Sequence, residues 1–141
     1  MDNVTKKHPL ILPQESYEIM GILYEIQNEL GTKYQEKHFH RAFEEKLIKY
    51  RKPYKKNVLV KLKYDGINLG KFYLDFVVGK SLKDFIIVEF KTTNHLHLDH
   101  ARQVLRYLKE TNIKLAILVN MRVKPLEYKR IVNPDIDKIK Y

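Results

Sequence analysis

The chain has 141 residues, with 27 Lys or Arg against 17 Asp or Glu, which gives a formal net charge of +10. A chain of this length forms a core without metal or disulfide staples, and the absence of cysteine excludes disulfides and thiolate metal sites. The positive charge indicates an anionic partner, with nucleic acid considered first and an anionic membrane surface second.

The apolar runs are short, and none approaches the roughly 20 residues needed to span a bilayer. The N-terminal stretch MDNVTKKHPLILP is too short in apolar residues for a signal peptide and ends at Pro13. No repeat, linker or low-complexity segment divides the sequence. We therefore expect a soluble cytoplasmic protein in which residues 1–141 form a single domain.

Two helices are predicted first. Residues 14–30 carry apolar side chains at helical spacing and end before Gly31. Residues 34–50 place Phe39, Phe43 and Leu47 on one stripe, and Glu36 lies at the head of that stripe, on the face expected to point inward.

The period then changes to two, which indicates strands. Residues 58–64 and 67–78 flank Asp65-Gly66, a dipeptide typical of a tight hairpin, and residues 83–91 form a third strand. A helix over 98–112 precedes a buried strand at 115–120, and 127–132 adds an edge strand. Strand, helix and buried strand in succession predict a parallel crossover, so the fold class is α/β.

Three charges stand in or beside the buried strands. Glu89 and Lys91 share one face of their strand, and Asp75 lies on the neighbouring strand within reach if the register allows. Buried charges are costly unless they are paired or bind a ligand. Either a structural ion-pair cluster or a catalytic site explains them, and two carboxylates beside a lysine suit Mg²⁺ and a phosphate substrate.

The pattern of Asp75 followed by Glu89-Phe90-Lys91 resembles the D…(D/E)xK signature of the PD-(D/E)XK nuclease superfamily, and the predicted order of elements is similar to its restriction-endonuclease-like core. Gln103 and Tyr107 resemble the QxxxY motif of some exonuclease branches. The stretch ELGTKYQEKHF resembles the GxxExxY proteins through Gly31 and Glu36, although Phe39 stands where tyrosine is expected and Thr32-Lys33 replaces Pro-Gly. The resemblance covers residues 14–132.

This resemblance implies a set of roles. The metal ligands would be Glu36, Asp75, Glu89 and the carbonyl of Phe90, and Lys91 would be the catalytic lysine. Gln103 and Tyr107 would position the substrate or a water. His100 also matches a histidine found in this group.

Structural interpretations of the same residues remain open. Glu36 also suits the first turn of a helix, where a carboxylate is favourable. Tyr107 also suits a core, and Gln103 a solvated helix position. His95, His97 and His100 invite a zinc site, but their spacing does not place two ligands on one helical face, and we expect no histidine metal centre.

The segment from Lys46 to Lys63 contains no acidic residue. Its cations are interleaved with Tyr50 and Tyr54, which favours a patch that tracks phosphates and stacks on bases. The residues predicted to contact nucleic acid are Lys49, Arg51, Lys52, Lys55, Lys56, His100, Arg102 and Arg106.

The sequence therefore predicts a Mg²⁺- or Mn²⁺-dependent nuclease that hydrolyses phosphodiester bonds, with DNA as the expected substrate and a homodimer as one arrangement. The alternative is a non-catalytic nucleic-acid-binding module, or an accessory subunit, that keeps a nuclease-like fold.

Overall fold

The computed structural model describes residues 10–141 and contains one five-stranded sheet in the order β1-β2-β3-β4-β5. Neighbouring strands are antiparallel except for β3 and β4, which are parallel and joined through α3. The α/β class, the order of the elements and the parallel crossover are confirmed. The interpretation of the N-terminal stretch falls largely on residues 1–9, which lie outside the described residues. Within residues 10–141, no helix is long and apolar enough to cross a membrane.

The elements follow the predicted ranges closely. The helices are α1 (Pro13–Leu30), α2 (Glu36–Lys49) and α3 (Leu98–Thr111). The strands are β1 (Tyr54–Tyr64), β2 (Ile67–Val78), β3 (Ile86–Lys91), β4 (Leu115–Asn120) and β5 (Glu127–Val132), with short 3-10 turns at Leu82–Asp84 and Ile136–Lys138. Asp65 and Gly66 both have positive φ, 53° and 77°, as the predicted tight hairpin turn requires.

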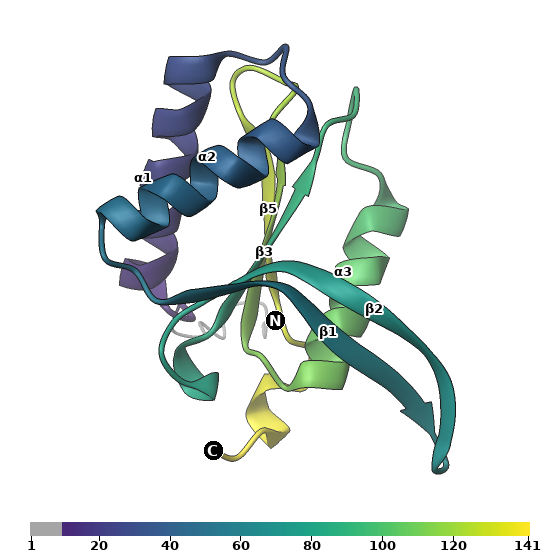
Figure 1. Cartoon of the computed structure of the whole chain (residues 1–141). Coiled ribbons are helices and arrows are strands. Elements are labelled where there is room, and N and C mark those ends of the chain that lie inside the picture. The colour runs from purple at the N-terminus through teal and green to yellow at the C-terminus, as the bar shows by residue number, and fades with distance from the viewer. Residues whose placement is uncertain (1–9) are drawn as a thin grey trace, which may run out of the picture.

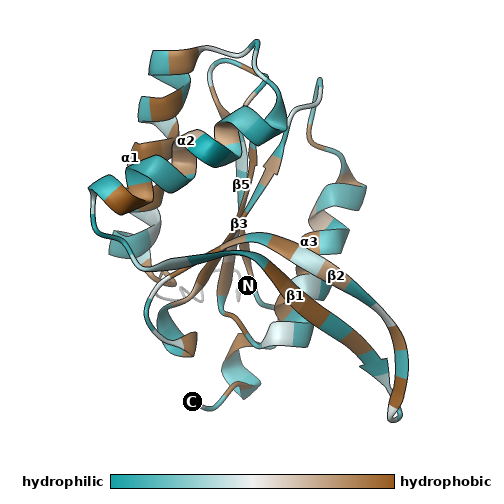
Figure 2. Cartoon of the chain, viewed as in Figure 1, coloured by the Kyte–Doolittle hydropathy of each residue, from teal (hydrophilic) through white to brown (hydrophobic). Residues whose placement is uncertain are grey.

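Helices cover both faces of the sheet (Figure 1). The first core packs α1 and α2 against one face, with Phe39, Phe43 and Leu47 fully buried against Phe76 and Phe90. The second core packs Val104, Tyr107 and Leu108 of α3 against the other face. Burying β3 and β4 on both sides explains why their sequences are almost continuously apolar, which Figure 2 shows for β3.

β1 begins four residues earlier than the alternating pattern predicts. Asn57 has a φ of 51°, which interrupts the alternation of side chains. Tyr54 packs against the first core, whereas Val58 packs against the second. A search for strict period two therefore finds only the part of the strand that follows Asn57.

Beyond this bend, β1 and β2 form a hairpin that extends away from the rest of the sheet (Figure 1). We call residues 58–74 the β-arm. Hydrophobic and hydrophilic residues alternate along it, as Figure 2 shows. Val58, Val60 and Phe72 face the second core, so the opposite face of the β-arm points to solvent.

Candidate active site

The predicted acidic residues meet where β2 and β3 separate. The pairing of these strands joins Phe76 to Val88, Val77 to Ile87 and Val78 to Ile86, and does not continue past Phe76. Beyond Phe76, hydrogen bonds from backbone N–H groups to carboxylate side chains take the place of backbone–backbone hydrogen bonds. The N–H of Asp75 donates to Oε1 of Glu89 at 2.8 Å, and the N–H of Phe90 donates to Oδ2 of Asp75 at 2.9 Å. We call this place the strand fork.

A local irregularity in β2 aims Asp75 toward α2. Leu74 belongs to the second core and Phe76 to the first, although strict alternation places residues two apart on the same face, so the alternation of β2 breaks between them. Asp75 lies at this break, and its Oδ2 is 3.4 Å from Nε2 of His40 on α2. Because neither Asn57 nor Asp75 has a partner in the register of β1 and β2, both strands depart from regular geometry at this level.

His40 is a site residue that the sequence interpretation missed. Its Nε2 lies 3.6 Å from Oε2 of Glu36, one turn earlier on α2, and its ring packs against Phe90 with centroids 5.0 Å apart. Nε2 is buried and makes no hydrogen bond within residues 10–141. Glu36, His40 and Asp75 each offer one ligand atom, and these atoms all lie within 4.8 Å of one another.

Burial and mutual repulsion disfavour the ionised form of Glu36 and Glu89. Burial raises the pKa of Glu89 well above its usual value, and the charge of Asp75 raises it further. The pKa of Glu36 is also raised, first by burial and then by Asp75. His40 and Lys91 oppose the rise at Glu36, and Lys91 opposes it at Glu89. The site thus holds carboxylates in excess over nearby cations.

Lys91 and the Phe90 carbonyl border the strand fork. Lys91 ends β3, is half-buried, and acts electrostatically on Glu36, Glu89 and His100. The N–H of Phe90 points to Asp75, and since the N–H and C=O of one strand residue point to the same side, the carbonyl faces the strand fork as well.

Tyr107 approaches the site from α3, on the other face of the sheet. Its ring stacks on Phe72 with centroids 4.2 Å apart, so it is also the core aromatic that the alternative interpretation expected. Burial raises the pKa of Tyr107 to about 12, and the charges of Glu89 and Asp75 add to the rise. Gln103 is half-buried one turn earlier on α3, and its side chain makes no hydrogen bond to another residue within 10–141.

The three histidines at the start of α3, His95, His97 and His100, form local hydrogen bonds. Nδ1 of His100 accepts the N–H of His97 at 3.2 Å, which caps the start of α3, and burial lowers the pKa of His100. The carbonyl of His95 accepts the Thr93 hydroxyl. Among residues 10–141, the group of Glu36, His40 and Asp75 is the one that gathers three metal-ligating side chains.

The basic segment has acidic partners that come from outside it. Lys46 pairs with Glu25 and Glu29 of α1, Lys52 with Glu18, and Lys56 with Glu44. The inference that this segment lacks compensating acids is therefore wrong, because the sequence window 46–63 excludes residues that the fold brings beside it. Its tyrosines are also engaged, since the Tyr50 hydroxyl binds Glu25 and the Tyr54 hydroxyl binds Glu44.

The other cations predicted to bind nucleic acid are more open. Lys49, Arg51 and Lys55 are exposed and form no ion pair with an acid among the described residues. On α3, Arg102 pairs with Asp99 at 3.3 Å, and Arg106 is exposed.

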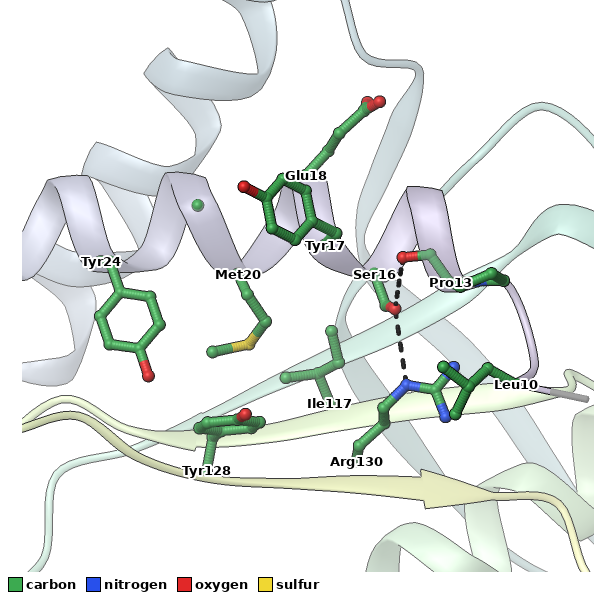
Figure 3. Close-up of a pocket in the computed structure, with 11 residues that line it drawn as sticks. Leu10, Pro13, Ser16, Tyr17, Glu18, Met20, Tyr24, Ile117, Tyr128 and Arg130 are labelled. Carbon is green, nitrogen blue, oxygen red and sulfur yellow. Dashed lines mark hydrogen bonds between the residues drawn. The ribbon is translucent and has the colours of Figure 1, made fainter. Parts of the chain in front are cut away.

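A cavity with a volume of about 520 Å³ lies away from the strand fork, between α1 and strands β4 and β5. Its lining is mainly apolar, and Figure 3 shows Met20, Tyr24, Ile117 and Tyr128 around it, with Arg130 contacting the Ser16 hydroxyl. Glu18, at its rim, is paired with Lys52. None of the strand-fork carboxylates lines this cavity, so its size does not make it the catalytic centre.

Comparison with known proteins agrees with this geometry. A family model described as the PD-(D/E)XK nuclease superfamily matches residues 13–131. The crystal structure of SSO0001 superposes with a TM-score of 0.58 at 19% sequence identity, over 88% of this chain and 64% of that one, which shows a shared fold. The chain therefore spans somewhat less than two thirds of that protein. No curated protein matches the sequence. Because the family model covers most of the chain, the protein belongs to the PD-(D/E)XK nuclease superfamily.

Proposed function

We propose that the strand fork is the active centre of a metal-dependent nuclease that hydrolyses phosphodiester bonds in DNA. The observation that carries this proposal is the convergence of Glu36, His40, Asp75 and Glu89 beside Lys91 at the one place where β2 and β3 separate. Of the GxxExxY pattern the chain keeps Glu36, with Lys33 in place of the glycine and Phe39 in place of the tyrosine, and this glutamate after the Leu30-Gly31 pair supports assignment to that branch of the superfamily.

The residues at the strand fork fit a divalent cation. Three ligand atoms lie within 4.8 Å of one another, and His40 Nε2 is buried without a hydrogen bond to any described residue, a state that ordinarily costs about 1–3 kcal/mol. Carboxylates whose pKa values are raised by burial and by each other are stabilised by a positive ion. Mostly oxygen donors favour Mg²⁺ or Mn²⁺ over softer metals, and a single imidazole is compatible with Mn²⁺.

A bound divalent cation supplies Lewis acidity at the phosphate. We assign Glu36, His40, Asp75, Glu89 and the Phe90 carbonyl to holding it. In hydrolysis, water adds to phosphorus, the bond from phosphorus to the leaving oxygen breaks, and that oxygen takes up a proton. We assign Lys91 to stabilising the negative charge that grows on the phosphate oxygens. Gln103 and Tyr107 bound the site from α3 and are assigned to positioning.

The experiment that tests this function compares wild type with Lys91→Ala and, as a matched control, Lys83→Ala in the exposed 3-10 turn. Labelled single-stranded, duplex and branched DNA and RNA are incubated with Mg²⁺, Mn²⁺ or EDTA. We expect metal-dependent products from wild type and Lys83→Ala alone. Binding without cleavage by all three proteins would refute the nuclease and favour a non-catalytic binding module.

A further inference from the structure

The solvent-facing side of the β-arm carries two lysines directly opposite each other. Lys61 on β1 pairs in register with Lys71 on β2, and both side chains are exposed. Like charges at directly opposed positions destabilise a strand pair. Neither lysine forms an ion pair with an acid in residues 10–141, in contrast to Lys46, Lys52 and Lys56 of the basic segment. An anion that lies between the two lysines would relieve the repulsion.

The next register pair on the same face is apolar. Leu59 and Tyr73 lie opposite each other and are 46% and 52% exposed. The Lys71 ammonium lies 6.0 Å from the centre of the Tyr73 ring, so the cation and the aromatic face are neighbours. This pair is no part of either core, and its apolar surface is open to a ligand.

Protection of an edge strand explains only part of this arrangement. Lysines often occupy edge strands, where they discourage pairing with another chain, and Lys61 on β1 suits that purpose. Lys71 suits it as well, because β2 pairs with β3 only through Phe76–Val78 and is open on that side at Lys71. Protection gives no reason, however, for an exposed Leu59–Tyr73 pair beside the lysines.

The same face leads to the strand fork. Lys71 and Tyr73 precede Asp75 on β2, and Asp75 turns toward α2, on the side of the sheet that bears the lysine pair. A small cavity of about 110 Å³, lined by Lys37, Arg41 and Asp75 among others, opens at this place. At about 3.3 Å per strand residue, Lys71 lies roughly 13 Å from Asp75, a distance that a few nucleotides cover.

We propose that the exposed face of the β-arm is a platform for single-stranded nucleic acid. Bases stack on Tyr73 and contact Leu59, and phosphates lie against Lys61 and Lys71. An open aromatic face beside cations suits a single strand, because the faces of its bases are available for stacking, whereas a duplex covers them. The inference rests on the proposed function for the direction of the strand toward Asp75, but the binding itself requires no cleavage.

Tyr73 provides a specific test because the chain contains no tryptophan. Tyr73→Trp places a single fluorophore on the platform, and Tyr17→Trp, at a 75% exposed position on α1, is the matched control. In EDTA, we expect an oligothymidylate to quench Tyr73→Trp but not Tyr17→Trp, and a duplex of the same length to quench it less. Equal quenching of both variants, or stronger quenching by the duplex, would overturn the proposal.

Affinity measurements give a second, independent readout. We expect Tyr73→Ala to weaken binding of the single strand by about 5- to 150-fold, while Tyr73→Phe stays near wild type. Lys61→Gln combined with Lys71→Gln should reduce the slope of log K against log salt by about 1.4. Wild-type affinity and slope in these variants would refute the platform.

The failures of the two proposals are distinguishable. If wild type shows metal-dependent cleavage while the lysine pair variant binds as wild type does, the platform is wrong and the nuclease stands. If Tyr73→Trp reports single-strand binding while wild type cleaves none of the substrates, the nuclease is wrong and the platform stands.

Discussion

The strand fork and the basic segment are both rich in charge, but they neutralise it differently. In the basic segment, three lysines each have an acidic partner from α1 or α2. At the strand fork, Glu36, Asp75 and Glu89 lie beside one another, and His40 Nε2 has no hydrogen bond from the part of the chain that the structure describes. Charges that are neutralised within the chain stabilise the fold. Charges held in excess of their partners mark the places where a ligand would restore the balance.

His40→Ala breaks the strand fork on its α2 side and should have the largest effect among these variants. Loss of the imidazole leaves Glu36 and Asp75 without the nitrogen between them, so we expect metal-dependent cleavage to fall by about 10- to 100-fold. Cleavage rates over a range of Mn²⁺ concentrations measure the change. His95→Ala, at an exposed position, serves as the control, and equal rates in the two variants would remove His40 from the site.

Glu89→Gln tests the cost of the buried carboxylate. The pKa of Glu89 is raised, so above the usual value of 4.5 the folded protein retains a proton that the unfolded chain releases. Stability therefore falls as the pH rises through the window up to the raised pKa. We expect Glu89→Gln to increase the free energy of unfolding at pH 8 in EDTA by about 1–3 kcal/mol and to flatten its pH dependence.

Denaturant unfolding at pH 5 and pH 8 measures this effect, with Glu110→Gln on the exposed side of α3 as control. Excess Mn²⁺ should reduce the difference in free energy of unfolding between Glu89→Gln and wild type, because it stabilises the folded wild type. A lower free energy of unfolding for Glu89→Gln than for wild type in EDTA would show that the carboxylate contributes net stability. It would contradict the view that the strand fork holds more negative charge than its own cations neutralise.

The smallest expected effects come from two substitutions in the basic segment, Lys52→Gln and Lys55→Gln, which contrast an ion-paired lysine with an exposed one. Lys52 is paired with Glu18, whereas Lys55 is exposed and forms no ion pair among the described residues. Lys52→Gln should leave nucleic-acid affinity and its salt dependence unchanged. Lys55→Gln should reduce the salt slope by about 0.7 to 0.9. Titrations at several salt concentrations distinguish the two, and the reverse order would show that ion pairing does not decide which lysines bind phosphate.

Much of the fold was predictable because its signals are local. The Phe39, Phe43 and Leu47 stripe, the Asp65-Gly66 turn and the apolar strands β3 and β4 each identify an element from a short window. The convergence of Asp75 and Glu89 was predictable as well, since two adjacent strands in a hairpin arrangement bring them together.

His40 was not predicted, because its contact with Asp75 joins α2 to β2 and depends on the departure of β2 from regular alternation. One local signal was available, since Glu36 and His40 are four apart and so share a helical face. The acidic partners of the basic segment were likewise out of reach, because Glu18 and Glu25 are distant in sequence and meet the lysines only when α1 packs on α2.

Calorimetric titration with Mn²⁺ of wild type, Asp75→Asn and His95→Ala tests the metal site at the strand fork most directly. Asp75 contacts His40, Phe90 and Glu89, so its carboxylate is the group on which both sides of the strand fork depend. We expect wild type and His95→Ala to bind Mn²⁺ at the same site and Asp75→Asn to lose that binding. Equal binding by all three proteins, or no binding by wild type, would contradict a metal centre at the strand fork.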